Sequence, residues 1–301
     1  MPLFIPRLSA SGKLHDMQLQ RYLDRIAFRG EIRPSPDILF ELQRAHVCAV
    51  PFENFDVHFG HPVVIEADMA YEKIVINNRG GWCYEQNGLF AWALTEIGFD
   101  VTRIAAAVMR QDRGEVADAN HLCLQVVCPE SESAYLADVG FGGSLLQPIE
   151  IRESEHVHAP FRLGLRKVDN SSWQFWEDIG RGEFSFDFRA EAADEEALRS
   201  KCHYLQTDPS SGFVLNTVTQ IRLPNQHRSL RGRVFSVATQ NGVESAVLDT
   251  PKQLVATLAD QFSLHLPEAA DLWPSITARH ETLHDEKAVE DTFAIRDRSN
   301  R

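Results

Sequence analysis

Cys83 has the sequence context of a nucleophile. It follows Gly80 and Gly81 in the stretch NNRGGWCYEQNGLF and begins a segment with helical spacing of apolar residues. The glycines allow a sharp turn into that helix. A thiol at a helix N-terminus faces unpaired N–H groups and the positive end of the helix dipole, which favour the thiolate. The stretch therefore predicts a reactive thiol, and the alternative from the same residues is a buried, inert one.

A nucleophilic cysteine needs a base and a group that orients the base. His121 opens the predicted strand HLCLQVVC, and Asp138 closes the next predicted strand, AYLADVGF. Because strands adjacent in sequence often pair, we expect both side chains at one end of a sheet. Each alone would more often be a strand-end histidine or a turn residue. Together with Cys83 they predict a triad in the order cysteine, histidine, aspartate.

The first third of the chain, which must position Cys83, has the periodicity of helices. We expect one helix in DMQLQRYLDRIAF and a second in SPDILFELQRAHVCAV, with Ser35 as N-cap and Pro36 at the first helical position. AYEKIVINN predicts a shorter helix. The helix that starts near Cys83 has an apolar stripe of five residues and should stop at Gly98. The stripe consists of Leu89, Phe90, Ala93, Leu94 and Ile97.

The pattern changes after Asp100, where short β-rich stretches alternate with polar or glycine-containing turns. This spacing favours an antiparallel barrel or sandwich. The expected strands are VTRIAAAVMR, HLCLQVVC, AYLADVGF, FRLGLRKV, SSWQFWED and EFSFDFR. A connecting helix is expected in AADEEALRSKCHYLQ. The last part mixes the predicted strands GFVLNTVTQIRL and RGRVFSVAT with a helix, PKQLVATLADQF, before a charged tail from about Lys287.

Composition limits the classes of partner and compartment. The chain has 301 residues and a formal net charge of −13, which argues against nucleic acid or an anionic membrane as a partner. No stretch approaches the length of a membrane-spanning helix. The five cysteines are odd in number and widely spaced, so they fit neither a disulfide framework nor a zinc site. These features predict a reduced, cytoplasmic protein without a metal.

The other four cysteines and one histidine run are expected to be passive. Neither Cys123 nor Cys128 has a predicted helix N-terminus or an obvious base beside it, and core thiols are expected at these two positions and at Cys48 and Cys202. Cys123 and Cys128 lie five residues apart, so on one strand their side chains would point to opposite faces. The run HVHAP, with His156 and His158, is expected to be a solvated loop rather than a metal site.

Four motifs, in order along the chain, resemble the arylamine N-acetyltransferase family. They are VPFENFDVHFG, NNRGGWCYEQNGLF, NHLCLQV and LADVGFGG, and weaker likeness extends from RYLDRIAF to the end. The resemblance implies an α+β fold with a helical bundle, a central antiparallel β-barrel and a C-terminal α/β lid around a thiol-protease-like core. The expected boundaries are 1–98 for the bundle, 99–190 for the barrel, 191–207 for an interdomain helix and 208–301 for the lid.

The resemblance also implies the chemistry. Cys83, His121 and Asp138 would form the triad of a cytoplasmic transferase of xenobiotic metabolism. Acetyl-CoA would be the acyl donor, and an aromatic amine, hydrazine or N-hydroxyarylamine the acceptor, with a ping-pong mechanism through acetyl-Cys83. The other implied roles are acceptor-pocket walls (Phe52, Phe141 and Phe213), approach of CoA to the backbone (Gly142 and Gly143) and a charged pair that positions the cysteine turn (Glu53 and Arg79).

Several alternatives stay open at the level of sequence. Without the family, the three phenylalanines would be ordinary core residues, the glycines plain turns, and the charged pair two surface charges. The same triad could serve a thioester or amide hydrolase. A relative that acts as an amide synthase in a biosynthetic pathway would share the motifs, and a catalytically silent scaffold protein is the remaining class.

Overall fold

The computed structural model describes residues 17–129, 131, 133–143, 145–180 and 182–283. Its N-terminal part is helical, as the periodicity predicts. The helices are α1 (Leu19–Arg25), α2 (Pro36–Ala49), α3 (Phe55–Phe59), α4 (Ala67–Tyr71), which continues into a π-helical turn (Glu72–Ile76), and α5 (Cys83–Ile97). Ser35 is the N-cap of α2 and Pro36 its first residue.

The helix α5 is the centre of the molecule. It begins at Cys83 and ends before Gly98, whose φ of 104° is the left-handed conformation that glycine adopts most easily. Most of its side chains are buried because it lies against β2 (Asp100–Val108) and β3 (His121–Val127) as well as α1 and α4. Because α5 is packed on several sides, its first residue, Cys83, is held in a fixed position.

The larger sheet has eight antiparallel strands in the order β5-β4-β3-β2-β9-β8-β7-β6. The strands not yet bounded are β4 (Ala134–Ala137), β5 (Ile149–Glu150), β6 (Ser154–His158), β7 (Phe161–Lys167), β8 (Ser172–Asp178) and β9 (Phe184–Arg189). The sheet curls, but no pairing joins β5 to β6 within the described residues. The expected barrel is therefore present as an open, curled sheet. Between β2 and β3 lie the short helix α6 (Arg110–Arg113) and a 3₁₀ turn (Gly114–Ala117).

Two local predictions were wrong. The run with His156 and His158 is not a loop: it forms the edge strand β6, which pairs with β7. Pairing uses backbone groups, so a polar segment can join a sheet edge. The start of GFVLNTVTQIRL is not a strand but the short helix α8 (Gly212–Leu215), because the Ser211 side chain accepts a hydrogen bond from Phe213 N at 3.3 Å and caps it.

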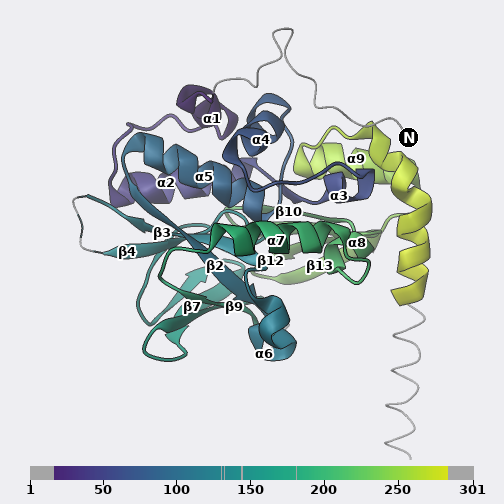
Figure 1. Cartoon of the computed structure of the whole chain (residues 1–301). Coiled ribbons are helices and arrows are strands. Elements are labelled where there is room, and N and C mark those ends of the chain that lie inside the picture. Colours follow the sequence, from purple (N-terminus) through teal and green to yellow (C-terminus); the bar gives the residue numbers. More distant parts are fainter. Residues whose placement is uncertain (1–16, 130, 132, 144, 181, 284–301) are drawn as a thin grey trace, which may run out of the picture.

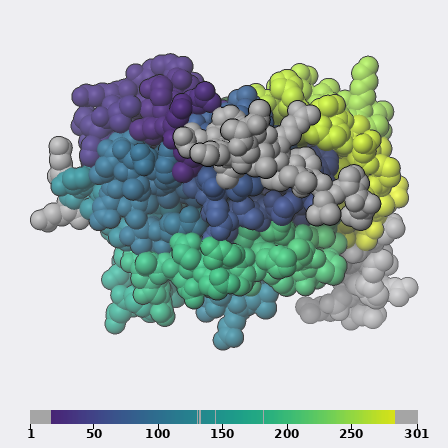
Figure 2. All heavy atoms as spheres, turned by 45° about the horizontal axis from the view of Figure 1, so that its top comes forward, coloured from purple at the N-terminus to yellow at the C-terminus, as the bar shows by residue number. Residues whose placement is uncertain are grey.

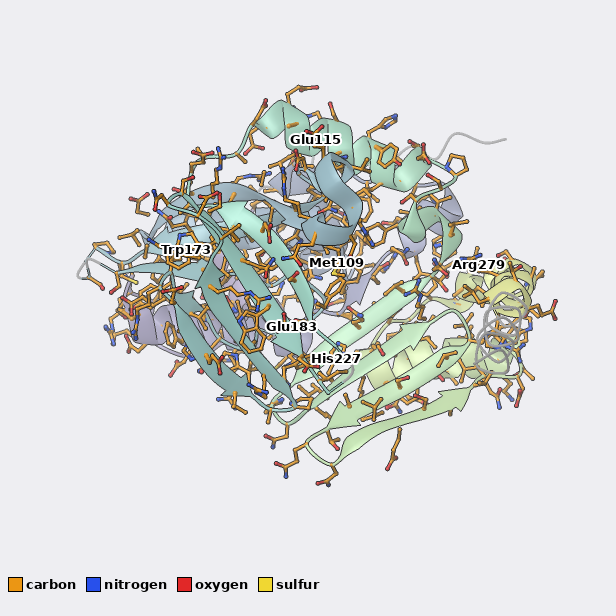
Figure 3. All side chains as sticks on the ribbon, turned by 90° about the horizontal axis from the view of Figure 1, so that it is seen from below. Met109, Glu115, Trp173, Glu183, His227 and Arg279 are labelled. Atoms are coloured by element: carbon orange, nitrogen blue, oxygen red, sulfur yellow. The ribbon has the colours of Figure 1, made fainter. Side chains whose placement is uncertain are left out.

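The smaller sheet has the order β1-β10-β11-β12-β13. Its strands are β1 (Phe52–Glu53), β10 (Val218–Leu223), β11 (Gln226–Arg231), β12 (Val234–Thr239) and β13 (Gly242–Val247). The helix α9 (Pro251–Phe262) packs on one face, followed by a 3₁₀ turn (Pro267–Leu272) and helical residues 273–283. The predicted connecting helix is α7 (Glu195–Thr207), which runs along the outside beside both sheets (Figures 1 and 3).

The hydrophobic core crosses the expected domain boundaries. One buried cluster joins residues of α1, α2 and α5 to Leu124 and Val126 of β3. The strand β1 comes from the N-terminal part yet adds to the sheet of the C-terminal part. The space-filling view shows the N-terminal helices at one end, the C-terminal helices at the other, and α7 along one edge (Figure 2). The boundaries at 98, 190 and 207 therefore stay a prediction.

Among residues 17–129 and the later described ranges, no helix is long and apolar enough to cross a membrane. The predicted charged tail from Lys287 lies outside the described residues.

Candidate active site

The turn before Cys83 is held by backbone contacts with residues 51–53. Gly81 N donates to Pro51 O at 3.2 Å, and Glu53 N donates to Gly81 O at 3.1 Å. A Cβ on Gly80 would come within 2.1 Å of Pro51 O, so only glycine fits there. The two glycines thus let the chain pass close to β1 before α5 begins, and this close approach determines where the Cys83 thiol starts.

The structure brings Cys83, His121 and Asp138 together, all at most 3% exposed. His121 Nε2 and Asp138 Oδ2 are 2.7 Å apart, and the Cys83 thiol is a hydrogen-bond partner of His121. Burial alone would lower the pKa of His121. The Asp138 carboxylate and Cys83 outweigh burial and raise this pKa to about 10. An imidazole that keeps its proton at neutral pH is suited to stand beside a thiolate.

We call the uncharged hydrogen-bond partners of Asp138 the amide support: Gln43, Asn87 and the backbone of Gly140. Asp138 Oδ1 accepts hydrogen bonds from Asn87 Nδ2 and from Gly140 N, both at 2.8 Å. Gln43 Oε1 accepts from Asp138 N at 3.1 Å. Asn87 lies one turn after Cys83 on α5, so the same helix carries the nucleophile and holds the aspartate.

Sequence reasoning missed the amide support. Gly140 is needed because a Cβ there would lie 2.6 Å from the Cys83 Cα. The sequence signal for Asn87 is its place four positions after the cysteine, on the same helix face, and the structure shows it fully buried. Gln43 gave no signal, because it is separated from Asp138 by 95 residues.

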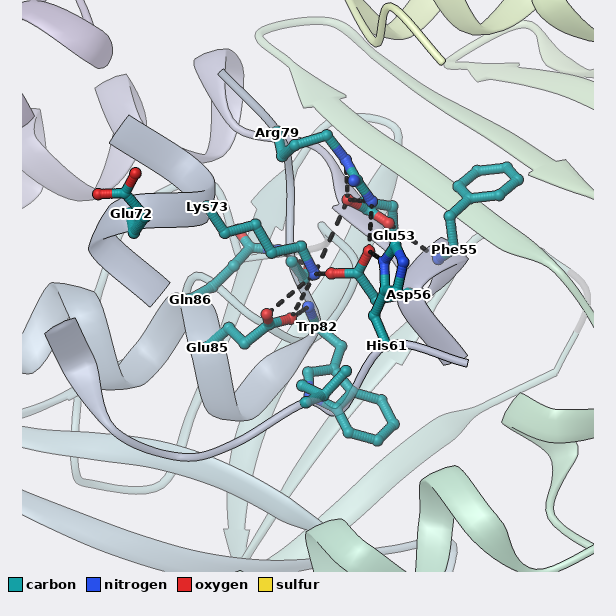
Figure 4. A network of polar contacts seen from close by, with 12 residues as sticks. Glu53, Phe55, Asp56, His61, Glu72, Lys73, Arg79, Trp82, Glu85 and Gln86 are labelled. Atoms are coloured by element: carbon teal, nitrogen blue, oxygen red, sulfur yellow. Dashed lines mark hydrogen bonds and ion pairs between the residues drawn. The ribbon is translucent and has the colours of Figure 1, made fainter. Parts of the chain in front are cut away.

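Five charged side chains, three buried and two partly buried, lie on the other side of the turn, and we call them the charged support: Glu53, Asp56, Lys73, Arg79 and Glu85 (Figure 4). Arg79 Nη2 is 2.8 Å from Glu53 Oε1 and 3.1 Å from Asp56 Oδ1. Lys73 Nζ is 2.8 Å from Asp56 Oδ2 and 2.9 Å from Glu85 Oε1. The sequence indicated only Glu53 and Arg79 and missed the other three residues.

The charged support has three carboxylates for two cations. Glu85 also accepts a hydrogen bond from Trp82 N at 3.0 Å, directly before the nucleophile. Burial raises the pKa of Glu85 to about 7, against the opposing effect of Lys73. Burial would likewise raise the pKa of Asp56, but Lys73 and Arg79 lower it below its usual value. Glu85 is therefore the carboxylate of this network that most readily takes up a proton.

Aromatic side chains surround the Cys83–His121 pair. On one side, Phe52 shares a buried cluster with Cys83, and its ring lies 6.3 Å from that of Phe213. On the other side, the Phe141 ring lies 5.2 Å from the imidazole of His121 and 5.2 Å from the ring of Phe184. The three phenylalanines singled out from the sequence thus lie near the pair, from both sides.

Gly142 and Gly143 have φ values of 99° and 117° and pack against the smaller sheet. A Cβ on Gly142 would come within 1.9 Å of Gln220 Oε1, and His227 Nε2 is 2.8 Å from Gly142 O. Gly142 still lines a cavity of about 340 Å³, whereas Gly143 faces Arg222 and His227. These contacts hold the loop against the smaller sheet.

The remaining cysteines differ from Cys83. Cys123 and Cys128 belong to separate core clusters, as expected for opposite faces. Burial raises the pKa of Cys48, Cys123 and Cys202, so these thiols stay protonated. Cys48 is only half-buried, contrary to its prediction as a core thiol. Within the described residues, no group of three or more metal-ligating side chains is present.

Comparison with known proteins gives one family. A family model described as N-acetyltransferase matches residues 37–271. The arylamine N-acetyltransferase of Mycolicibacterium smegmatis is 33% identical over 263 residues, which cover 84% of this chain and 94% of that protein. The arylamine N-acetyltransferase of Mycobacterium tuberculosis is 30% identical over 267 residues, covering 85% and 92%.

Solved structures agree with the sequence comparison. The M. smegmatis arylamine N-acetyltransferase aligns with a TM-score of 0.79 at 30% identity, covering 87% of this chain and 98% of that one. The Mycobacterium marinum arylamine N-acetyltransferase in complex with CoA aligns with a TM-score of 0.78 at 28% identity and the same coverages. The likeness therefore extends through both sheets and the helices.

Proposed function

The chain belongs to the arylamine N-acetyltransferase family, and from this we propose that it transfers an acetyl group from acetyl-CoA to an aromatic amine, hydrazine or N-hydroxyarylamine. One observation carries the proposal: Cys83 is a hydrogen-bond partner of the His121 imidazole, and Nε2 of the same ring is 2.7 Å from Asp138 Oδ2. We further propose that this triad is catalytic and that transfer follows a ping-pong mechanism in a cytoplasmic enzyme of xenobiotic metabolism.

In the first half-reaction the Cys83 thiolate attacks the thioester carbonyl carbon of acetyl-CoA. The new carbon–sulfur bond forms as the bond to the CoA sulfur breaks, and the CoA thiolate takes the proton from the His121 imidazolium. The N–H groups of the first turn of α5 have no acceptors within the helix and are available to the developing oxyanion. Exchange between two thiols is nearly balanced, so the acetyl-enzyme can accumulate.

In the second half-reaction the amine nitrogen attacks the acetyl-cysteine. His121 Nδ1 accepts a proton from the amine, while Asp138 holds Nε2 and so determines the orientation and tautomer of the ring. The Cys83 sulfur then leaves as thiolate, paired again with imidazolium. Amide formation from a thioester is downhill, which drives the cycle forward.

We propose that the aromatic residues around the pair bind the acceptor. Phe52 and Phe213 would form one wall and Phe141 the other, because their rings lie on both sides of the reacting atoms. The smaller sheet with α9 would act as the lid, and CoA would pass Gly142 and Gly143. No metal takes part in this scheme.

The test is intact-protein mass spectrometry after brief mixing with acetyl-CoA in the absence of amine. We expect one acetyl group, mapped by peptides to Cys83, which an arylamine or hydrazine then discharges. Cys83→Ala should show no adduct and no transfer, while Cys48→Ala should behave as wild type. A Cys83→Ala variant with near-normal activity would refute the assignment.

The same experiment separates the alternatives. Rapid consumption of acetyl-CoA without amine would indicate a hydrolase, because the acyl-enzyme would then react with water. An adduct formed from longer acyl thioesters but not from acetyl-CoA would indicate an amide synthase. Absence of any adduct from either kind of donor would overturn the proposal.

A further inference from the structure

A chain of buried, uncharged side chains runs from α1 to the carbonyl group of Gly81, two residues before the nucleophile. The Tyr22 hydroxyl oxygen lies 2.8 Å from His46 Nδ1, and His46 Nε2 lies 3.2 Å from Gln86 Oε1. Gln86 Nε2 donates to Gly81 O at 2.6 Å. The three side chains come from α1, α2 and α5 and are at most 1% exposed. We call Tyr22, His46 and Gln86 the neutral chain.

The direction of every hydrogen bond in the neutral chain follows from its last acceptor. A carbonyl oxygen can only accept, so the Gln86 amide directs its NH2 group to Gly81 O and its Oε1 to His46. His46 Nε2 therefore carries the proton that it donates to Oε1. Burial lowers the pKa of His46 to about 3, so the ring is uncharged at neutral pH and Nδ1 carries no proton. Nδ1 then accepts from the Tyr22 hydroxyl, which keeps its proton because burial raises the pKa of Tyr22.

The neutral chain ends on a peptide group that is held at both of its ends. Gly81 O also accepts from Glu53 N at 3.1 Å, and the N–H of the same peptide group, Trp82 N, donates to Glu85 Oε2 at 3.0 Å. Figure 4 shows Gln86 and Glu85, neighbours on the first turn of α5, close to Trp82.

The orientation of this peptide group determines how α5 begins. It precedes Cys83 directly, and Trp82 is the N-cap of the helix. A tilt of the peptide plane would change the direction of the Cys83 thiol and of the N–H groups in the first turn that have no acceptor within the helix. Without the Gln86 amide, Gly81 O would keep the Glu53 N–H but lose the shorter of these two hydrogen bonds.

We propose that the neutral chain positions Cys83 for acetyl transfer. Gln86 and His46 are positioning residues, and Tyr22 is the donor that fixes the tautomer of the His46 ring. The assignment rests on the proposed function, since it concerns the nucleophile of that reaction. It is distinct from the roles of the other two networks, because the charged support acts through ion pairs and the amide support acts on Asp138.

The first test measures acetylation of Cys83 in a single turnover. Gln86→Met keeps the length of the side chain but cannot donate to Gly81 O, and Tyr22→Phe removes only the first donor of the chain. We expect the maximal rate to fall about tenfold or more in Gln86→Met and about threefold in Tyr22→Phe, because the reacting sulfur is displaced. The acetyl-CoA concentration that gives half of this rate should stay within about twofold of wild type.

A double-mutant cycle tests whether Tyr22 acts through Gln86. If it does, Tyr22→Phe slows acetylation of the wild type but adds nothing to the loss in Gln86→Met. Two independent structural losses would multiply instead. The rate of Cys83 alkylation by iodoacetamide, which needs no acetyl-CoA, should follow the same pattern.

Tyr71→Phe is the matched control. Tyr71 is a buried tyrosine whose hydroxyl donates to Gln18 O at 3.2 Å, and its ring packs edge-on against Trp92, as the Tyr22 ring does. We expect this variant to acetylate at the wild-type rate. Urea titrations of both tyrosine variants show whether any difference in rate follows stability instead.

NMR of protein labelled at the histidine ring nitrogens supplies a readout that needs no acyl transfer. A protonated and an unprotonated ring nitrogen resonate at different frequencies. We expect the His46 signals, assigned by their loss in His46→Gln, to show the proton on Nε2 and none on Nδ1.

The outcomes separate the two proposals. A proton on His46 Nδ1, multiplying effects in the cycle, or wild-type acetylation by Gln86→Met or Tyr22→Phe would overturn the neutral chain. An equal slowing by Tyr71→Phe would also overturn it, since loss of any buried hydroxyl would then suffice. If Gln86→Met does not fold, the two tyrosine variants and the NMR decide. If acetyl-CoA does not acetylate Cys83 in the wild type, the proposed function fails, and alkylation and NMR still test the chain.

Discussion

Two networks hold the first turn of α5, and they are built from different chemistry. The charged support joins five ionisable side chains around residues 53–85 and meets the backbone of the turn at Trp82 N. The amide support lies on the sheet side and holds a single acidic residue, Asp138. Asn87 Nδ2 and Gly140 N donate to its carboxylate, and Gln43 Oε1 accepts from its backbone N–H. One network thus contacts the backbone directly before the nucleophile, and the other contacts the aspartate that orients the base.

This difference predicts different functions for the two networks. Buried ion pairs require that charges leave water. Removing one partner therefore leaves the other as an uncompensated buried charge, which destabilises the fold. Neutral hydrogen bonds to Asp138 involve smaller free energies, but they determine the direction of its carboxylate and hence of His121. We expect variants of the charged support to lose stability first and variants of the amide support to lose activity first.

The largest effect on stability is expected for Lys73→Met. It removes the cation that contacts Asp56 and Glu85 and leaves the three carboxylates of the charged support with one arginine. The free energy of unfolding should fall by about 3–5 kcal/mol in urea titrations. Lys252→Met, at an exposed position of α9, is the control and should stay within about 0.5 kcal/mol. A change that small in Lys73→Met would contradict the comparison.

Gly140→Ala should have the largest effect on activity. The new Cβ would lie 2.6 Å from the Cys83 Cα and 2.7 Å from Asn87 Nδ2, so the nucleophile or the loop must move. A displacement of this kind should reduce kcat/KM about 100-fold. The rate of Cys83 alkylation by iodoacetamide should fall with it. Gly212→Ala, where the Cβ would meet nothing within 4 Å, is the matched control for both rates.

Asn87→Ala tests the contribution of the amide support. It removes the 2.8 Å hydrogen bond to Asp138 and the 2.6 Å bond to Leu122 O. We expect kcat/KM to fall about tenfold and unfolding free energy to fall by about 1–3 kcal/mol, less than in Lys73→Met. If Asn87→Ala lost more stability than Lys73→Met and kept full activity, the proposed division between the networks would be wrong.

The smallest effect is expected for Glu85→Gln at pH 5. Burial raises the pKa of Glu85 in the folded protein to about 7, whereas the unfolded chain releases this proton near the ordinary glutamate pKa of 4.5. The folded state thus binds more protons between these values, so stability from this group falls as pH rises through that window. At pH 5 the variant should unfold with nearly wild-type free energy in urea.

At pH 8 the same variant should be the more stable protein, because it no longer carries the excess buried charge. Unfolding titrations at both pH values check this. An unchanged difference between wild type and variant from pH 5 to pH 8 would show that Glu85 does not titrate in this range and that the charged support has no excess carboxylate to neutralise.

Local signals in the sequence predicted many elements. The helix that begins at Cys83 and stops before Gly98, the start of α2 after Ser35 and the connecting helix α7 follow from periodicity, proline and glycine positions. The strands β3 and β4, with His121 and Asp138 at one end, follow from alternation and short connections. The family itself followed from four motifs, which report common ancestry rather than physics.

The tertiary structure decided what local patterns cannot report. Strand pairing placed His156 and His158 in the edge strand β6. It also paired Phe52 with Gln220, which are 168 residues apart in the sequence. Folding also collected Lys73 and Asp56 under the nucleophile, placed Gln43 against Asp138, and connected Tyr22 to Gln86 through His46. Periodicity and caps act over one or two turns of chain, whereas these contacts join segments that only the packed core brings together.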